Sequence, residues 1–129
     1  MEKAAFFDIR ADIPKNRLYV ILEGYFGDQD SLLGMEKAIA EVKKLKPGFS
    51  VITDISKFKP ATAFALERIQ QGQQAVAKQG VKRIIRIVDR SHITGQMQFV
   101  RMGKQVYDSV DPNTADSIAA AEAMLDADL

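Results

Sequence analysis

The chain has 129 residues, of which 47% are hydrophobic and 27% are charged, and it carries a net charge of +1 and no cysteine. This length predicts one domain spanning residues 1–129. The near-neutral charge gives no electrostatic reason to expect nucleic-acid binding, and the lack of cysteine excludes disulfides, thiolate catalysis and zinc-finger sites. The first residues lead straight into a strand pattern, so we expect no signal peptide, no membrane insertion and a cytoplasmic location.

Two strands are expected first. Residues 6–13 alternate apolar and polar side chains, which is typical of a half-buried strand. Turn residues follow at 14–17, where proline presets φ and asparagine tolerates the left-handed region. The apolar run at 18–26 predicts a second strand, paired with the first as an antiparallel hairpin.

A helix is expected next. Residues 27–30 break the apolar run, and Asp28 or Asp30 is the expected N-cap. Apolar residues then recur at steps of three and four up to about Leu45, which indicates one buried face, and the Pro-Gly pair at 47–48 ends the helix. Three lysines crowd its C-terminal end, where a solvated helix end is favoured over a phosphate or partner patch: Lys43, Lys44 and Lys46.

The centre of the chain combines a strand, a loop and a helix. Residues 49–55 are almost all apolar, which predicts a strand covered on both faces. The following helix is expected from Pro60 or Thr62 to Gln79, and Gly80 ends it. Its glutamines are expected to cover much of the outer surface: Gln70, Gln71, Gln73, Gln74 and Gln79.

The last third of the chain adds one strand and two helices. Residues 81–88 predict the fourth strand, and a third helix is expected to end near Val110, before Pro112. Asn113 or Thr114 then caps a short alanine-rich helix. The order β-β-α-β-α-β-α-α predicts an α/β fold with a mixed four-stranded sheet, in which right-handed crossovers join the parallel strands.

Two stretches support a family resemblance. The third strand ends in Asp54-Ile55-Ser56, and residues 113–125 form a short closing segment with a capping hydroxyl before an alanine- and acid-rich helix. With the element order, these stretches resemble the STAS domain, which is the fold of sulfate-transporter cytoplasmic domains and of bacterial anti-sigma-factor antagonists. The resemblance implies a STAS-like signalling module that acts through protein–protein contacts.

The resemblance fails at one motif. The antagonists open the next helix with Asp-Ser-Ser-Gly, and a partner kinase phosphorylates one of the serines. That motif falls on residues 61–65 of this chain, Ala-Thr-Ala-Phe-Ala, where the acid, the serine pair and the glycine are missing. We therefore expect no normal phosphoserine switch. Thr62 is expected to be an N-cap, and its alternative role is that of a weak phosphoacceptor.

The loop after the third strand is the expected docking surface. Ser56 is expected to bond local backbone rather than act as a nucleophile, because no histidine is close in sequence. Lys57 and Lys59 are either simply solvated or steer an anionic partner. The expected partner or ligand contacts are Asp54, Ser56, Lys57, Phe58, Lys59, Thr62, Phe64 and His92.

His92 is the only histidine in the chain. Asp89 and Ser91 share its loop, but adjacent loop residues rarely present triad geometry, and no nucleophile elbow is present. One histidine without cysteine also argues against a transition-metal site. We therefore expect no catalytic residue, metal or cofactor. An enzyme that uses this histidine with Asp89 and Arg90 is the least favoured hypothesis.

A sheet face left open by the helices would favour a homodimer, because large apolar patches seldom stay exposed. The alternation along the second strand groups Tyr19 with Ile21, and along the fourth strand it groups Ile84 with Arg86. We expect these four side chains to share one face. The alternative is that a helix covers that face.

Two functions fit these patterns. The leading hypothesis is a non-enzymatic STAS-like regulatory module that binds an unidentified protein partner at the junction of the third strand and the second helix. The alternative is a small-ligand or lipid-binding module with an apolar cleft near that junction. Residues expected to line the cleft are Phe58, Phe64, Ile93, Met97 and Phe99.

Overall fold

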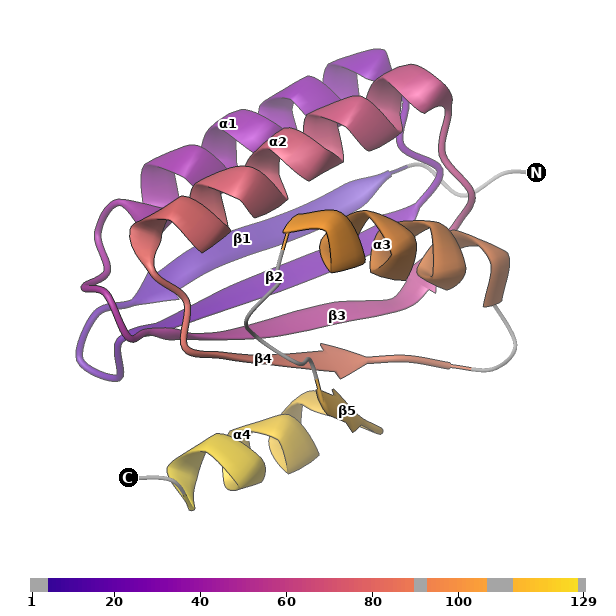
Figure 1. Ribbon diagram of the computed structural model, residues 1–129. Coiled ribbons are helices and arrows are strands. Elements are labelled where there is room, and N and C mark those ends of the chain that lie inside the picture. Colours follow the sequence, from indigo (N-terminus) through magenta and orange to yellow (C-terminus); the bar gives the residue numbers. More distant parts are fainter. Residues whose placement is uncertain (1–4, 90–92, 107–112, 128–129) are drawn as a thin grey trace.

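The computed structural model describes residues 5–89, 93–106 and 113–127 (Figure 1). These residues form an α/β fold in which four helices pack on a mixed five-stranded sheet. The strands lie in the order β1-β2-β3-β4-β5, which is also their order along the chain. The first pair is antiparallel and the other three pairs are parallel.

The predicted N-terminal hairpin is confirmed. Strand β1 (Phe6–Asp12) pairs antiparallel with β2 (Arg17–Gly24), and Asp12 lies opposite Arg17 beside the turn. Asn16 in that turn has a φ of 51°, in the left-handed region that asparagine tolerates better than most residues. The turn chemistry therefore sets the register of the first two strands.

Helix α1 (Asp28–Val42) begins earlier than either expected cap allows, because Gly27 is its N-cap. The prediction of Asp28 or Asp30 as the cap is wrong. Asp30 instead accepts a hydrogen bond from the backbone N–H of Gly27 at 3.4 Å, and both aspartates lie in the first turn, where the helix dipole favours negative charge. Leu45 is buried just beyond the helix.

The central strand and helix follow. Strand β3 (Ser50–Phe58) lies between β2 and β4 (Arg83–Ile87) and is parallel to both. Helix α2 (Ala63–Gln79) connects β3 to β4 along the chain. Thr62 is its N-cap and Gly80 is its C-cap. Gly80 has a φ of 99°, a conformation that suits glycine at a helix C-terminus.

The C-terminal part contains a strand that the sequence pattern did not predict. After α3 (Ile93–Val106), residues Asn113–Ala115 form β5, which pairs parallel with β4. The prediction of a four-stranded sheet is therefore wrong. Asn113 and Thr114 do not cap α4 (Ile118–Asp126), because Ser117 does, accepting a hydrogen bond from the Ala120 N–H at 3.1 Å. The expected end of the third helix, near Val110, lies outside the described residues.

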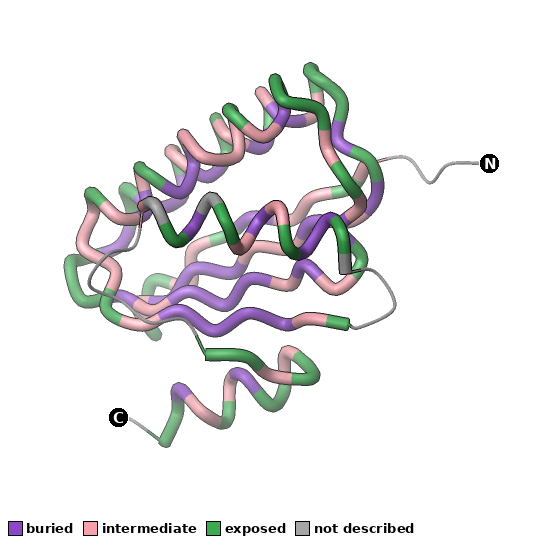
Figure 2. Tube along the Cα trace, turned by 45° about the vertical axis from the view of Figure 1, so that its right-hand side comes forward, coloured by how far each residue is buried: buried purple, intermediate pink, exposed green. Residues whose placement is uncertain are grey.

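Helices cover both faces of the sheet. Figure 1 shows α1, α2 and α3 on one face and α4 on the opposite face. Val51 and Ile55 of β3 pack towards the three helices, whereas Ile52 packs towards α4. The sheet is accordingly the most deeply buried layer in Figure 2, and the predicted cover on both faces of the third strand is confirmed.

A row of aromatic rings crosses the core on the three-helix face. The ring centroids are 6.5 Å apart for Phe7 and Phe26, 5.8 Å for Phe26 and Phe58, and 6.1 Å for Phe58 and Phe99. Tilted and edge-on pairs at these separations each contribute about 0.5–1.5 kcal/mol beyond their buried area. The row links β1 to α3 through the end of β3.

Candidate functional site

The end of β3 contains a register shift that Asp54 holds in place. Ile21 of β2 lies opposite Asp54, but Glu23 lies opposite Lys57, so β3 has one extra residue here. The Asp54 carboxylate accepts hydrogen bonds from both the backbone N–H and the hydroxyl of Ser56, at 3.0 and 2.6 Å. The two residues therefore stabilise the irregular strand end.

Thr62 sits at the start of α2 in the expected capping role. Its backbone is extended, and its Oγ1 accepts a hydrogen bond from the Ala65 N–H at 3.2 Å. Thr62 as a whole residue is exposed. The N-cap prediction is confirmed, and the role of phosphoacceptor stays a prediction.

The start of α3 is fastened to the loop between β3 and α2. Gln98 accepts a hydrogen bond from the Ala61 N–H at 2.9 Å. A Cβ placed on Gly95 would lie 2.5 Å from the Phe58 carbonyl oxygen, so only glycine fits this approach. The Gln96 amide accepts from the Asp89 N–H at 2.7 Å and donates to the Asp89 carbonyl oxygen. These contacts bring the ends of β3 and β4 and the beginnings of α2 and α3 together.

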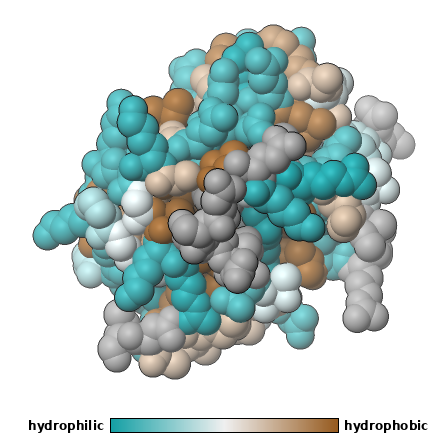
Figure 3. All heavy atoms as spheres, viewed as in Figure 1, coloured by the Kyte–Doolittle hydropathy of each residue, from teal (hydrophilic) through white to brown (hydrophobic). Residues whose placement is uncertain are grey.

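Around this contact lies a mixed surface, which we call the junction surface and define as Lys57, Lys59, Thr62, Phe64 and Met97. Phe64 on α2 and Met97 on α3 are large apolar side chains that remain 42% and 44% exposed. Lys57 is exposed and Lys59 half-buried. The face seen in Figure 3 is mostly hydrophilic with scattered hydrophobic patches.

Other predicted contacts lie elsewhere. Phe58 is fully buried in the aromatic row and cannot be part of the docking surface without movement. His92 falls outside the described residues, as do Arg90 and Ser91. Within the ranges that are described, no three His, Cys, Asp or Glu side chains cluster as a metal site requires.

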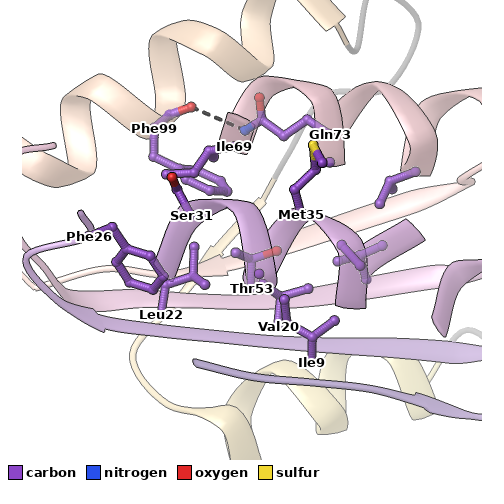
Figure 4. A pocket seen from close by; sticks show the side chains of 15 residues that line it. Ile9, Val20, Leu22, Phe26, Ser31, Met35, Thr53, Ile69, Gln73 and Phe99 are labelled. Carbon is purple, nitrogen blue, oxygen red and sulfur yellow. Dashed lines mark hydrogen bonds between the residues drawn. The ribbon is translucent and has the colours of Figure 1, made fainter. Parts of the chain in front are cut away.

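A cavity of about 60 Å³ lies between the sheet and the helices α1, α2 and α3 (Figure 4). Its walls are mainly aliphatic and aromatic, and they come from β1, β2, β3 and all three helices. Of the residues expected to line an apolar cleft, Phe99 lines this cavity and Phe58, Phe64 and Met97 do not. The side chain of Ile93 lies outside the described residues. The cavity is therefore deeper than the predicted cleft.

Three polar side chains interrupt the apolar wall: Ser31 of α1, Thr53 of β3 and Gln73 of α2. The Gln73 side chain is the least expected, because the sequence pattern placed it on the outer surface. It is 5% exposed, so that prediction is wrong. Helical spacing could have found it, because position 73 lies four residues after Ile69 and three before Val76, on the inward face.

Gln73 leaves one hydrogen-bonding atom unused. Its Nε2 donates to the Phe99 carbonyl oxygen at 3.4 Å, drawn as a dashed line in Figure 4. Its Oε1 is buried and accepts no hydrogen bond from any described residue. An unmatched buried acceptor costs about 1–3 kcal/mol relative to a satisfied one. Gln73 therefore lowers stability where an apolar side chain would not.

No protein-family model matches this sequence, and no curated protein matches it either. None of the helices in the described ranges is long and apolar enough to cross a membrane. The assignment of a function therefore depends on the geometry of the junction surface and of the cavity.

The four candidate dimer-face residues do not share a face. Tyr19 lies in register with Ile52 and Ile85, and these three side chains pack under α4. Ile84 and Arg86 point the other way: Ile84 belongs to the core under the helices of the opposite face, and the Arg86 guanidinium lies 5.8 Å from the Phe99 ring centre. The expectation of one shared face is wrong, whereas homodimerisation stays a prediction.

Helix α4 is joined to β2 by two polar contacts. Arg17, which is 2% exposed, donates to the Asp126 carboxylate at 2.9 Å, and the Tyr19 hydroxyl donates to Glu122 at 2.7 Å. Burial raises the pKa of Tyr19 above its ordinary value, and the Glu122 carboxylate acts in the same direction. The hydrogen bond from Arg17 lowers the pKa of Asp126. The charge state of both pairs is therefore coupled to the docking of α4.

Proposed function

We propose that this chain is a STAS-like, non-enzymatic regulatory module that binds a partner protein through the junction surface. The observation that carries the proposal is the exposure of Phe64 and Met97, which lie close in sequence to the hydrogen-bonded residues Ala61 and Gln98. Exposed aromatic and methionine side chains are frequent anchors of protein interfaces. The order of the first four strands and three helices, with Asp54 and Ser56 at the end of β3, supports the STAS-like assignment.

The charges around these anchors suggest the chemistry of the partner. Lys57 is exposed beside them, and the Arg68 guanidinium lies 4.6 Å from the centre of the Phe64 ring. A complementary surface would present an apolar pocket with acidic side chains at its rim. The partner in this proposal is therefore a protein with an acidic, apolar-centred patch.

The proposed module works without the phosphoserine switch of the antagonists. Thr62 is the hydroxyl at the start of α2, and its oxygen already caps the helix. Phosphorylation there would place negative charge at the positive end of the helix dipole and beside Lys57 and Lys59. In this proposal, the amount of partner protein present determines how much complex forms. The alternative is that phosphorylation of Thr62 regulates partner binding.

The test is capture of the tagged protein's partners from its native lysate, with and without phosphatase treatment. The informative variants are Phe64→Ala and Met97→Ala, singly and together. Leu33→Ala is the matched control, because Leu33 is a large apolar side chain that is 45% exposed and belongs to α1, which contributes no residue to the junction surface. We expect the double variant to reduce recovery of a specific partner at least tenfold and Leu33→Ala to leave it unchanged. Equal recovery by all variants would remove the junction surface from the proposal.

A second candidate function is small-ligand binding, and the cavity behind α1 and α2 favours it. Small-molecule sites in proteins are enclosed, mostly apolar and equipped with few polar groups. Because the cavity and the junction surface share no residue, either function can fail without the other. A bound molecule that co-purifies with the protein in native mass spectrometry would support ligand binding.

A further inference from the structure

We infer that one end of the molecule docks on the surface of an anionic lipid bilayer. This end, which we call the basic end, presents six exposed lysines from three neighbouring segments of the chain. They are Lys15, Lys43, Lys44, Lys46, Lys78 and Lys82. The inference goes beyond the proposed function, because the junction surface lies at the opposite ends of β3 and α2.

Hydrogen bonds hold the three segments of the basic end against one another. Asn16, in the β1–β2 turn, donates to the Lys46 carbonyl oxygen at 3.2 Å and accepts from the Lys46 N–H at 2.9 Å. The Gly48 N–H donates to the Gly80 carbonyl oxygen at 2.7 Å. Figure 1 shows the β1–β2 turn and the α1–β3 and α2–β4 connections together at one end of the sheet. The fold therefore gathers lysines that are far apart in the sequence.

Helix ends alone do not explain this cluster. A solvated helix end is the expectation from the sequence for Lys43, Lys44 and Lys46, and lysines do suit the negative end of a helix dipole. The structure adds Lys15 and Lys82, which belong to neither α1 nor α2. The positive charge at this end is therefore larger than the two helix ends call for.

The acidic side chains beside these lysines already have partners. Glu41 is 6% exposed and pairs with Lys44. Asp126 pairs with the buried Arg17 at 2.9 Å, and Asp12 accepts a hydrogen bond from the backbone of the β1–β2 turn at 3.2 Å. The other five lysines of the basic end form no ion pair with a described residue. Their charge faces solvent, where an anionic surface can approach it.

One apolar side chain lies beside the lysines. Ile13, in the β1–β2 turn two residues before Lys15, is 60% exposed, more than any other large hydrophobic residue that the structure describes. Clusters of about four to eight basic residues are typical of surfaces that bind anionic lipids. An apolar side chain next to them enters the boundary between headgroups and acyl chains. The combination matches a bilayer whose headgroups carry negative charge.

A nucleic acid would meet the same charges but lacks suitable neighbours. Proteins that bind single strands stack the bases on aromatic side chains. Among the described residues, the aromatic side chains with large exposed fractions are Phe6, Tyr25 and Phe64. They lie at the opposite ends of β1, β2 and α2 from the basic end. The aliphatic Ile13 therefore favours lipid over nucleic acid.

Docking by the basic end leaves the junction surface free. Helix α2 has 17 residues and is about 25 Å long. Its last turn contains Lys78, whereas Thr62 and Phe64 of the junction surface lie at its beginning. The two surfaces can therefore be occupied at the same time, and either can fail in experiment without the other.

The first test is sedimentation of the full-length protein with lipid vesicles. One set contains about 30% phosphatidylserine in phosphatidylcholine, and the other contains phosphatidylcholine alone. We expect at least tenfold stronger binding to the anionic vesicles at about 50 mM NaCl, and loss of that binding at about 500 mM, because salt screens exposed charges. Equal binding to the two sets, or binding to neither, would overturn the inference.

Charge reversals then locate the surface. Lys46→Glu combined with Lys82→Glu changes two of the three segments and leaves their backbone hydrogen bonds in place. Lys57→Glu combined with Arg101→Glu is the matched control, because both residues are exposed and lie on β3 near its end and on α3. We expect the first pair to weaken binding to anionic vesicles at least tenfold and the control pair less than threefold. An equal loss in two folded proteins would show that net charge alone decides and would overturn the placement.

The apolar side chain provides an independent measurement. Because the chain has no cysteine, Ile13→Cys and Leu33→Cys each introduce a single site for an environment-sensitive fluorophore. Leu33 is the control, because it is 45% exposed on α1. We expect anionic vesicles to shift the emission of the label at position 13 to the blue and to leave the label at position 33 unchanged. No shift at position 13, or an equal shift at position 33, would overturn docking by this end.

A final comparison separates lipid from nucleic acid. Duplex DNA also carries a dense array of phosphates and attracts lysines in a salt-dependent way. We expect the anionic vesicles to reach half-saturation at a lower phosphate concentration than duplex DNA does at the same salt concentration. The opposite order would overturn lipid as the partner of the basic end.

Discussion

The hydroxyl of Tyr19, on the second strand of the chain, donates a hydrogen bond to the carboxylate of Glu122, on the last described helix, across 2.7 Å. The Arg10 guanidinium covers the same phenol ring, 4.4 Å from its centre. Beneath these polar groups the apolar side of α4 packs on Ile52 and Ile85. The hydrogen bond therefore fixes α4 at a defined position on a contact that is otherwise apolar and directionless.

Removing this hydrogen bond is expected to weaken the fold modestly. Tyr19→Phe keeps the ring and deletes the donor, so the free energy of unfolding should fall by about 1 kcal/mol, typical of one hydrogen bond. The thermal midpoint should drop by about 3–5 °C. Tyr25→Phe is the control, because Tyr25 is 40% exposed. A midpoint in Tyr19→Phe equal to that of the control would mean that the bond contributes nothing to α4 docking.

The same phenol predicts a loss of stability in alkali. Burial, with Glu122 nearby, raises the folded-state pKa of Tyr19 above its ordinary value of 10.0. The contribution of neutral Tyr19 to the free energy of unfolding is therefore complete below pH 10. It is lost as the pH rises through the pKa that Tyr19 has in the folded state. Urea unfolding from pH 8 to 11.5 should show this decline in the native protein and a shallower one in Tyr19→Phe. Parallel curves for the two proteins would contradict the assignment.

Glu41 predicts a loss of stability in acid. It accepts hydrogen bonds from Lys44 and from the Ala11 N–H, and together these lower its pKa below the ordinary value of 4.5. The stabilisation that ionised Glu41 gives to the folded state is present above pH 4.5. It is lost as the pH falls through the lower pKa of the folded state. Glu41→Gln keeps an acceptor for Ala11 but cannot titrate. Its unfolding free energy should therefore vary less between pH 5 and 3 than that of the native protein.

Adding one methyl group at two glycines should have opposite effects. Gly95→Ala places a Cβ 2.5 Å from the Phe58 carbonyl oxygen, where only backbone movement relieves the clash. We expect a loss of about 2–3 kcal/mol, typical of overpacking. Gly72→Ala has room and should gain about 0.5–1 kcal/mol from helix propensity. Chemical denaturation of both variants measures the two changes in the free energy of unfolding. If Gly95→Ala left this free energy unchanged, α3 would be free to shift.

The strand irregularity at the end of β3 should depend more on Asp54 than on Ser56. Asp54→Ala removes both hydrogen bonds of the pair and should cost about 2 kcal/mol, whereas Ser56→Ala removes one and should cost about 1 kcal/mol. Equilibrium unfolding measures the difference. If Ser56→Ala proved the more damaging change, the serine hydroxyl would have a role beyond this bond.

Local patterns predicted most elements because their causes are local. Alternation identified the first hairpin strand and an apolar run identified the second, and turn residues such as Asn16 and Gly80 adopt the left-handed backbone that their chemistry favours. The Thr62 cap follows from the same kind of local hydrogen bonding. By contrast, β5 is three residues long and its hydrogen bonds come from β4. No sequence window that short contains the periodicity of a strand, so it was missed.

Two errors in the candidate site have different physical origins. Alternation groups residues within one strand, but which residues of neighbouring strands share a face depends on their register. The register aligns Tyr19 with Ile85 and not with Ile84, which moved half of the proposed dimer face to the other side. Gln73 was misplaced because its polarity was given more weight than its helical position. The register between strands cannot be read from one strand's pattern, whereas the burial of Gln73 could have been read from its helical spacing to Ile69 and Val76.

The position of β5 and α4 has a consequence for the order in which the fold can be completed. Tyr19, Ile52 and Ile85 are covered by α4, which a ribosome makes after the strands and the other three helices of this fold. Until β5 and α4 emerge, the growing chain presents an apolar sheet face and an open edge on β4, both of which promote aggregation. Messages truncated before residue 113 should therefore give insoluble chains, and a cell that makes this protein has reason to degrade them quickly.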